Sequence, residues 1–566
     1  MEKADDIVVI GGMACGPKAA ARARRCDPKA RITIVEEGAN VSEATCGLPY
    51  HISGVIEKQR ELVMRKPDFF KDVLDVDVLT RTRATSIDRQ AHTLKLLNLE
   101  TEQVSTLAYD RLVLATGSTP ATLGLKETGL GGIFTLSKIE DALAIRDLLA
   151  QDSTRKAVIV GAGLIGLEVA EAFVSRGLEV TVVETFDRVL PTLLDPEMAA
   201  HVAGQLRSKG VKLLLGQRVT GVDGDGEGWV QQVRTENGKL EAGLVLLSIG
   251  ARPNTGLAQE AGLGIGPTRG ISVNQYLQTS DLHIYAGGDC VENVHRITQR
   301  KVLAPMGSTA NKHGRIIGTN ITGGSETFPG VLGTAVVKVF DYNVARAGLT
   351  ESQAREAGFD VLTCLVPGDE HATYYPGARQ ILVKLVADGD GLRLLGAQVV
   401  GLGETVKRVD VLATALSFGA TADDLANIDL AYAPPYNNAM DPLHHAANVL
   451  RNKQSGDARA LNPAEVRERT ESGADFILLD VRTPEEWEAG HIEAPQTRPL
   501  PLKELRSRLG ELPAGGEIVT YCKASVRAYQ AQRILDAAGF KDAKFLDGSI
   551  SAWPYDLPAR EEDSTQ

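Results

Sequence analysis

Two passages of the chain share one pattern of apolar and polar positions. Each begins with a short apolar, β-branched run, IVVI at 7–10 and AVIV at 157–160, and continues through a glycine-rich turn into an alanine-rich stretch. Each ends in a second apolar run, RITIV at 31–35 and VTVV at 180–183. The β-branched runs predict buried strands and the alanine-rich stretches predict helices. The chain therefore contains two predicted strand–turn–helix–strand units, about 150 residues apart.

The spacing of glycines in the second strand–turn–helix–strand unit is typical of a dinucleotide-binding site. Gly161, Gly163 and Gly166 form G-x-G-x-x-G between the strand and the helix, and Glu184 ends the next strand about 20 residues on. Glycines there let the backbone close on a pyrophosphate at the positive end of a helix, and the acid can accept a hydrogen bond from a ribose 2′-hydroxyl. Because a carboxylate repels a 2′-phosphate, we expect NADH to be preferred over NADPH.

The first unit carries a weaker version of the same signal. Gly11 and Gly16 keep the outer glycine positions, Met13 replaces the middle glycine, and Glu36 ends the second strand. The repeat of turn, helix and terminal acid predicts a second dinucleotide. The sequence therefore predicts two dinucleotide sites on one chain.

Two further segments, YDRLVLATGSTP at 109–120 and TSDLHIYAGGDC at 279–290, each indicate a strand that runs into a turn. They resemble the ATG and GD segments of two-dinucleotide, glutathione reductase-like flavoproteins. That resemblance implies an α/β fold with bound FAD, in which the aspartate contacts a ribityl hydroxyl. The residues that match these segments are Ala115, Thr116, Gly117 and Asp289.

Composition excludes several other classes of protein. The 566 residues carry 61 basic and 73 acidic side chains, a net charge of −12, and no basic run long enough to follow a phosphate backbone, so nucleic acid is not an expected partner. No apolar stretch is long enough to predict a membrane span. The six cysteines are dispersed without paired spacing, which indicates neither a disulfide framework nor a metal site. We expect a cytoplasmic protein with reduced thiols.

One cysteine stands apart in its setting. Cys46 lies in VSEATCGLPYHISG, and its nearest neighbour in sequence, Cys26, is twenty residues away. A thiolate without an internal partner has to form a mixed disulfide or persulfide with substrate sulfur, or a sulfenate with peroxide. Cys46 is therefore the candidate redox centre.

The C-x-L-P-Y setting of Cys46, preceded by Ser42, resembles the coenzyme A disulfide reductase family over roughly residues 1–450. The resemblance implies reduction of coenzyme A disulfide or persulfide, with Ser42 and Thr45 beside the substrate. The family usually reads S-F-x-N-C at this point, whereas here Glu43 and Thr45 replace the aromatic residue and the amide. Coenzyme A is thus an expected ligand, bound with a changed contact.

The same resemblance implies a homodimer in which tyrosines of one subunit reach the active site of the other. The stretches HATYYPGA and AYAPPYNNAMDP match those segments, which gives this role to Tyr374 and Tyr432, with Tyr375 and Tyr436 as neighbouring alternatives. A phenol can donate a proton to a leaving thiolate. On composition alone, packing in a core or an interface is the more common role for such tyrosines, and only the resemblance favours the catalytic one.

Related flavin oxidases and peroxidases, which use a lone cysteine as a sulfenate, are the main alternative. They usually carry a histidine in the first glycine-rich turn, where this chain has Ala14. A second alternative is a sulfur carrier that performs no reduction.

A new pattern begins after the polar segment RNKQSGDARALNP at 451–463. FILLDVRTPEEWEAGHIEAP and EIVTYCKASVRAYQAQRIL each start with a buried strand, and the second strand delivers Cys522 into a turn that opens a helix. The two passages resemble a rhodanese domain over roughly residues 460–557.

The loop from Cys522 to Arg527 has the composition expected of a site that stabilises an anionic sulfur. Its amides can point inward at the helix N-terminus, and Lys523 and Arg527 add positive charge, which together stabilise a thiolate or a persulfide anion. The C-x4-R spacing forms a ring suited to a small sulfane sulfur, whereas C-x5-R loops of phosphate enzymes are one residue wider. Ser525 stands where many rhodanese loops have glycine. We expect Cys522 to be catalytic.

The fusion of these parts predicts an enzyme of sulfur metabolism. We expect an FAD-dependent, NADH-oxidising reductase of persulfides, polysulfides and coenzyme A disulfide or persulfide, in which Cys522 handles sulfane sulfur and Cys46 reduces it. The tether raises the frequency of their encounter. The predicted divisions are 1–118 and 249–325 for FAD, 119–248 for NADH, 326–450 for dimerisation, 451–463 as a linker, 464–557 as the rhodanese domain and 558–566 as a polar tail.

Overall fold

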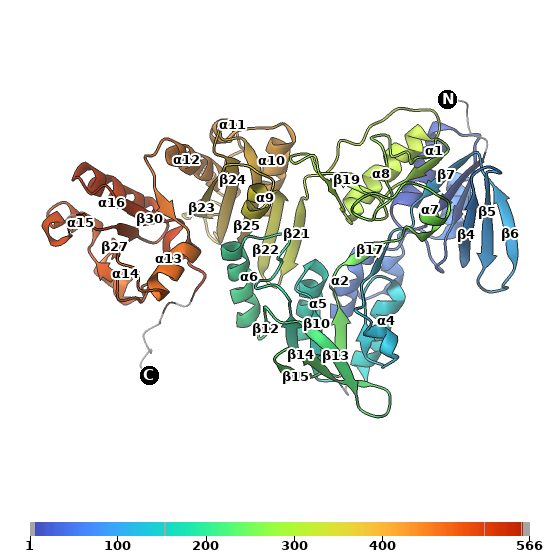
Figure 1. Cartoon of the computed structure of the whole chain (residues 1–566), viewed down its shortest axis with the longest axis horizontal. Coiled ribbons are helices and arrows are strands. Elements are labelled where there is room, and N and C mark those ends of the chain that lie inside the picture. The colour runs from blue at the N-terminus through green and yellow to red at the C-terminus, as the bar shows by residue number, and fades with distance from the viewer. Residues whose placement is uncertain (1–5, 152–153, 514, 556, 558–566) are drawn as a thin grey trace. The chain divides into compact units, whose positions relative to one another are not determined.

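A computed structural model describes residues 6–151, 154–513, 515–555 and 557 of the chain (Figure 1). The chain divides into two compact units, one formed by residues 1–185 and 217–331 and the other by residues 186–216 and 332–566. The predicted polar tail at 558–566 lies outside the described residues.

The first unit begins with a parallel sheet in the order β18-β7-β1-β2-β3. Helix α1 (Cys15–Cys26) and helix α8 (Gly307–Asn320) lie side by side against it (Figure 1), and their buried side chains share one core cluster. A Cβ at Gly314 or Gly318 would collide with the backbone of α1, so glycine permits this close approach. The strands are β1 (Asp6–Ile10), β2 (Arg31–Val35), β3 (Val76–Leu79), β7 (Arg111–Leu114) and β18 (Ile284–Ala286).

The second predicted strand–turn–helix–strand repeat, which also belongs to the first compact unit, forms a parallel sheet of its own. Strands β11, β10, β16 and β9 neighbour one another in that order, and α5 (Leu164–Ser175) connects β10 to β11. The pairing of β10 with β11 repeats that of β1 with β2, which confirms the repeat expected from the sequence. The strands are β9 (Ile133–Phe134), β10 (Lys156–Val160), β11 (Glu179–Val183) and β16 (Leu244–Leu247).

An antiparallel sheet in the order β21-β22-β25-β24-β23 is the centre of the second unit. A buried lysine, Lys384 on β24, forms ion pairs with Asp195, Glu197 and Glu351. Helix α12 runs on to Gln454, inside the segment expected as a linker. The elements are β21 (Ala335–Val339), β22 (Tyr342–Gly348), β23 (Val361–Asp369), β24 (Gln380–Asp388), β25 (Leu394–Gly401), α6 (Pro196–Ser208), α10 (Val406–Ser417), α11 (Ala422–Asn427) and α12 (Pro442–Gln454).

The same unit contains the C-terminal parallel sheet, in the order β26-β30-β29-β27-β28. Two buried clusters include the side chains from this sheet and from its helices, as expected for strands that are covered on both faces. The elements are β26 (Ala460–Leu461), β27 (Ile477–Asp480), β28 (Thr497–Pro499), β29 (Ile518–Tyr521), β30 (Ala543–Leu546), α13 (Pro463–Glu471), α14 (Pro484–Glu488), α15 (Leu502–Leu505) and α16 (Val526–Ala537).

Among the described residues, no helix is both long enough and apolar enough to cross a bilayer. The same residues contain no cluster of histidine, cysteine and acidic side chains placed to hold a metal ion.

Candidate active site

The second glycine-rich turn has the shape that a pyrophosphate requires. Gly161 has φ +105°, and a Cβ there or at Gly166 would collide with neighbouring backbone. At Gly163 a Cβ would meet its nearest atom only at 4.0 Å, so this glycine leaves open space. Helix α5 begins at Leu164, and no side chain of the described residues caps its first amides. The turn therefore offers N–H groups to an anion.

Each glycine-rich turn has an acid at the end of the next strand. Glu184 is buried, and its Oε2 accepts a hydrogen bond of 2.7 Å from the Ala162 amide. Glu36 does the same in the first turn, where Oε2 accepts from the Gly12 amide at 2.6 Å. Both carboxylates thus lie against the turns, at the place where a ribose would follow a pyrophosphate.

The first turn also packs on the predicted ATG segment. Gly11 has φ +108°, and a Cβ there would collide with the carbonyl of Ala115. A Cβ at Gly16 would collide with the carbonyl of Gly11 in the same way. Met13, in place of the middle glycine, is half-buried, so the turn accepts a side chain at this position.

The predicted FAD segments come together although they are far apart in sequence. Thr116 donates from Oγ1 to the Asn254 carbonyl at 2.6 Å, and Asn254 donates from Nδ2 to the Thr116 carbonyl at 2.8 Å. Gly117 follows with φ +66°. Ser118 donates from Oγ to Asp289 Oδ2 at 3.2 Å, and burial raises the pKa of Asp289. A half-buried carboxylate with so few partners fits a hydroxyl-bearing ligand such as the ribityl chain of FAD.

Cys46 is exposed, in a short 3₁₀ turn (Thr45–Gly47) just before α2 (Leu48–Ser53). Thr45 is exposed beside it. The Ser42 amide donates to the Gly12 carbonyl at 2.7 Å, and Ser42 has φ +58°. The cysteine loop is therefore anchored directly to the first glycine-rich turn.

A second link joins the cysteine segment to the helix of the other turn. Tyr50, on α2, donates from its hydroxyl to Oε1 of Glu168, on α5, at 3.4 Å. Burial raises the pKa of Tyr50 to about 12 and that of Glu168 to about 7. No motif in the sequence selects Glu168, although it stands two residues after the last glycine of the turn. Cys46 thus lies in a segment tied to both predicted dinucleotide sites.

The predicted tyrosines belong to the second unit. The hydroxyls of Tyr374 and Tyr432 lie 2.9 Å apart, so one phenol donates to the other, and this hydrogen bond raises the pKa of Tyr374. Both side chains are exposed, as are Tyr375 and Tyr436. The structure therefore pairs the two tyrosines that the sequence selects.

The C-terminal loop places Cys522 between β29 and α16, with only 1% of the residue exposed. Ser525 has φ +68°, a conformation that favours glycine. Arg527 donates to both oxygens of Glu486, at 2.6 and 2.7 Å, and this pairing holds the pKa of Glu486 at about 2. Much of the positive charge expected for the loop is therefore balanced by Glu486, while Lys523 stays exposed.

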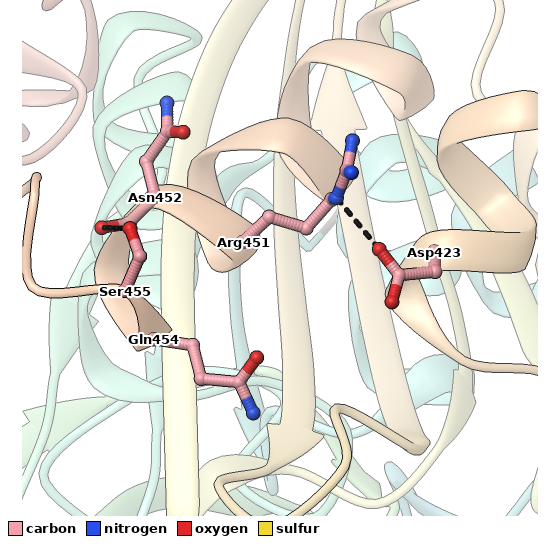
Figure 2. A pocket seen from close by; sticks show the side chains of 5 residues that line it. All are labelled: Asp423, Arg451, Asn452, Gln454 and Ser455. Carbon is pink, nitrogen blue, oxygen red and sulfur yellow. Dashed lines mark hydrogen bonds and ion pairs between the residues drawn. The ribbon is translucent and has the colours of Figure 1, made fainter.

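A cavity of about 540 Å³ opens at the end of α12 (Figure 2). Its walls are polar, and Arg451 forms an ion pair with Asp423 across it. No residue predicted for a cofactor or a substrate lines this cavity, so it is separate from the chemistry described above.

The fold and these sites define an oxidoreductase with two dinucleotide-binding units, an antiparallel dimerisation-type domain and a rhodanese-like domain. Comparison with known families agrees. Residues 5–307 match the pyridine nucleotide-disulphide oxidoreductase family, residues 334–444 its dimerisation domain and residues 462–555 the rhodanese-like domain. The chain belongs to the pyridine nucleotide-disulphide oxidoreductase family.

Individual members of this family are similar to the chain over most of their length. An NAD(P)H coenzyme A polysulfide/persulfide reductase of Pyrococcus horikoshii is 38% identical over 79% of this chain and 98% of its own length. A coenzyme A disulfide reductase of Staphylococcus haemolyticus is 30% identical over 77% of this chain and 97% of its own length. The solved structure of an NAD-dependent persulfide reductase from A. fulgidus is 44% identical, covers 97% of this chain and 100% of its own, and superposes with a TM-score of 0.92.

Proposed function

We propose that this chain is an FAD-dependent, NADH-oxidising reductase of persulfides and polysulfides, including coenzyme A persulfide or disulfide, with Cys46 as its redox centre. The observation that carries the proposal is the exposed Cys46 thiol, whose segment is anchored to one glycine-rich turn by Ser42 and to the helix of the other by Tyr50. The relatives that act on persulfide, polysulfide and coenzyme A disulfide support it. For a persulfide the balance is RSSH + NADH + H⁺ → RSH + H₂S + NAD⁺.

The residues of the chain divide the work as follows. The two glycine-rich turns hold FAD and NADH, with Glu36 and Glu184 on the two riboses and Asp289 on the ribityl chain. Bound FAD supplies the two-electron transfer from NADH to a sulfur–sulfur bond. The Cys46 thiolate attacks the sulfur of the substrate and holds it as a mixed disulfide or a persulfide while a thiol leaves.

Two further assignments belong to this proposal. Tyr374 and Tyr432, already paired by a hydrogen bond, protonate the leaving thiolate across the interface of a homodimer, and Ser42 and Thr45 contact the substrate beside Cys46. In the rhodanese-like domain, Cys522 accepts sulfane sulfur, which Lys523, Ser525 and Arg527 surround. Cys522 thereby concentrates the substrate that Cys46 reduces.

The test compares substrates and cysteine variants under NADH. We expect the wild-type enzyme to turn over coenzyme A disulfide, coenzyme A persulfide and polysulfide. Cys46→Ser keeps flavin reduction by NADH and loses turnover of these sulfur substrates. Cys26→Ser is the matched control, because Cys26 is also exposed but lies at the end of α1, and it keeps full turnover.

Other results contradict the proposal. Brisk NADH oxidation with peroxide or oxygen, but none with sulfur substrates, identifies an oxidase or a peroxidase. Continued turnover of coenzyme A disulfide by Cys46→Ser removes Cys46 from the reaction. If NADH does not bleach the flavin, the protein is not an NADH-dependent reductase, and the remaining function is that of a sulfur carrier through the rhodanese-like domain.

A further inference from the structure

A buried serine that no motif selects lies against the Cys522 loop. Ser549 follows β30 in a short 3₁₀ turn (Ser549–Ala552), and its side chain is fully buried. Its Oγ accepts hydrogen bonds from the amides of Cys522 and Ser525, each at 3.1 Å. These two amides belong to the loop that would hold the sulfane sulfur.

The proton of this hydroxyl has two acceptors within reach. A serine hydroxyl has one donor and two lone pairs, and the two amides already occupy the lone pairs. The O–H group can donate to the Leu546 carbonyl at 3.3 Å or to the Cys522 sulfur at 3.8 Å. With both lone pairs engaged, the one O–H proton is shared between these two competing acceptors.

A charged sulfur changes the balance between these acceptors. Hydrogen bonds to an ionised acceptor are roughly twice as strong as those between neutral groups. Around the loop, Arg527 is paired with Glu486 and also interacts with Cys522, Arg482 is paired with Asp480, and Lys523 is exposed. Cys522 itself is almost fully buried, so a donor that is also buried stabilises its anion without competition from water.

We propose that Ser549 is a catalytic residue of the rhodanese-like domain, whose hydroxyl turns from the Leu546 carbonyl to the Cys522 sulfur when that sulfur is anionic. This inference rests on the proposed role of Cys522 as the acceptor of sulfane sulfur. With thiosulfate as the donor, the Cys522 thiolate attacks the outer sulfur, the new Sγ–S bond forms and the S–S bond of thiosulfate breaks. Sulfite leaves with the electron pair, and the negative charge of the enzyme moves to the persulfide sulfur. The same O–H group stabilises the thiolate before this step.

The backbone of Ser549 offers a variant in which relief of strain offsets part of the cost of leaving the two loop amides without their acceptor. Ser549 has φ +52°, a conformation that glycine adopts without strain. Ser549→Gly therefore removes the hydroxyl and relieves the backbone, whereas Ser549→Ala removes only the hydroxyl. The matched control is Ser551→Ala, because the Ser551 hydroxyl lies in the same turn but accepts from Gln380.

The measurement is the rate of alkylation of Cys522 by iodoacetamide against pH, followed on the peptide that contains Cys522, together with the rate of thiosulfate:cyanide sulfur transfer. For Ser549→Gly and Ser549→Ala we expect the midpoint of the alkylation profile to rise by about one pH unit, and both rates at neutral pH to fall by about tenfold. The Ser551→Ala protein should match the wild type. Thermal melting of Ser549→Gly checks that this variant is folded.

The outcomes separate this inference from the proposed function. Ser549 variants with an unchanged alkylation midpoint overturn the inference, as do variants that transfer sulfur as fast as the wild type. A wild-type enzyme that transfers no sulfur from thiosulfate contradicts the proposed role of Cys522, and the alkylation profiles then still decide whether Ser549 stabilises the thiolate.

Discussion

A buried ion pair joins the rhodanese-like domain to the antiparallel sheet of the second unit. Asp547, directly after β30, accepts at Oδ2 from the Leu365 amide of β23 at 3.0 Å and from Lys453 Nζ of α12 at 2.6 Å. Side-chain exposure is 5% for Asp547 and 10% for Lys453. Asp547→Ala removes the carboxylate from both contacts.

Asp547→Ala lowers the free energy of unfolding because it leaves the Lys453 charge without its carboxylate. Among the described residues, Lys453 would keep the Thr363 carbonyl, at 2.8 Å, as the hydrogen-bond acceptor of a nearly buried charge. Removing one member of a buried ion pair typically costs about 3–5 kcal/mol. For a body of this size that corresponds to a fall of roughly 6–20 °C in the first thermal transition.

The assay is calorimetry together with limited proteolysis near residues 455–459, the segment between α12 and β26. We expect Asp547→Ala to lower the first transition and to speed cleavage there. The control is Asp423→Ala, which breaks the exposed ion pair with Arg451 (Figure 2) and should cost only about 0–1 kcal/mol. An Asp547→Ala protein that melts and resists protease like the control refutes the reasoning.

Three further predictions concern single residues. Burial raises the pKa of Glu168 from 4.5 to about 7, so its stabilising effect is complete below about pH 4.5 and is lost as the pH rises through about 7. Between pH 5 and pH 8 the free energy of unfolding, measured in urea, should therefore fall less for Glu168→Gln than for the wild type, by on the order of 3 kcal/mol. Equal falls for the two proteins would contradict this. Glu184→Ala should lower the ratio of kcat/KM for NADH to that for NADPH by about tenfold, and an unchanged ratio would count against the ribose contact. Cys522→Ser should abolish thiosulfate:cyanide transfer and keep NADH turnover on coenzyme A disulfide; retained transfer would assign it to another residue.

The parts of the fold that local sequence determines could be predicted. The β-branched strands and the glycine spacing predict both nucleotide-binding units, and the paired registers of β1 with β2 and of β10 with β11 confirm this repeat. The glycines are required because a Cβ at Gly11 or Gly161 would collide with the chain that follows another strand. Such constraints act within a short segment and therefore leave a motif.

The contacts that were missed join residues far apart in sequence. Tyr50 meets Glu168 only because α2 packs on α5, and Ser549 reaches the Cys522 loop only because β30 lies beside β29. Glu486 pairs with Arg527 across 41 residues for the same reason. A single polar residue in a turn has no spacing pattern that reveals such a partner.

Mass spectrometry of Cys46 tests the central claim most directly. The oxidised enzyme is mixed with coenzyme A disulfide or a polysulfide without NADH, and the peptide that contains Cys46 is then weighed before and after NADH is added. The account predicts a covalent sulfur adduct on Cys46 that NADH discharges within one turnover. A Cys46 peptide that stays unmodified, while the enzyme still reduces these substrates, would contradict it.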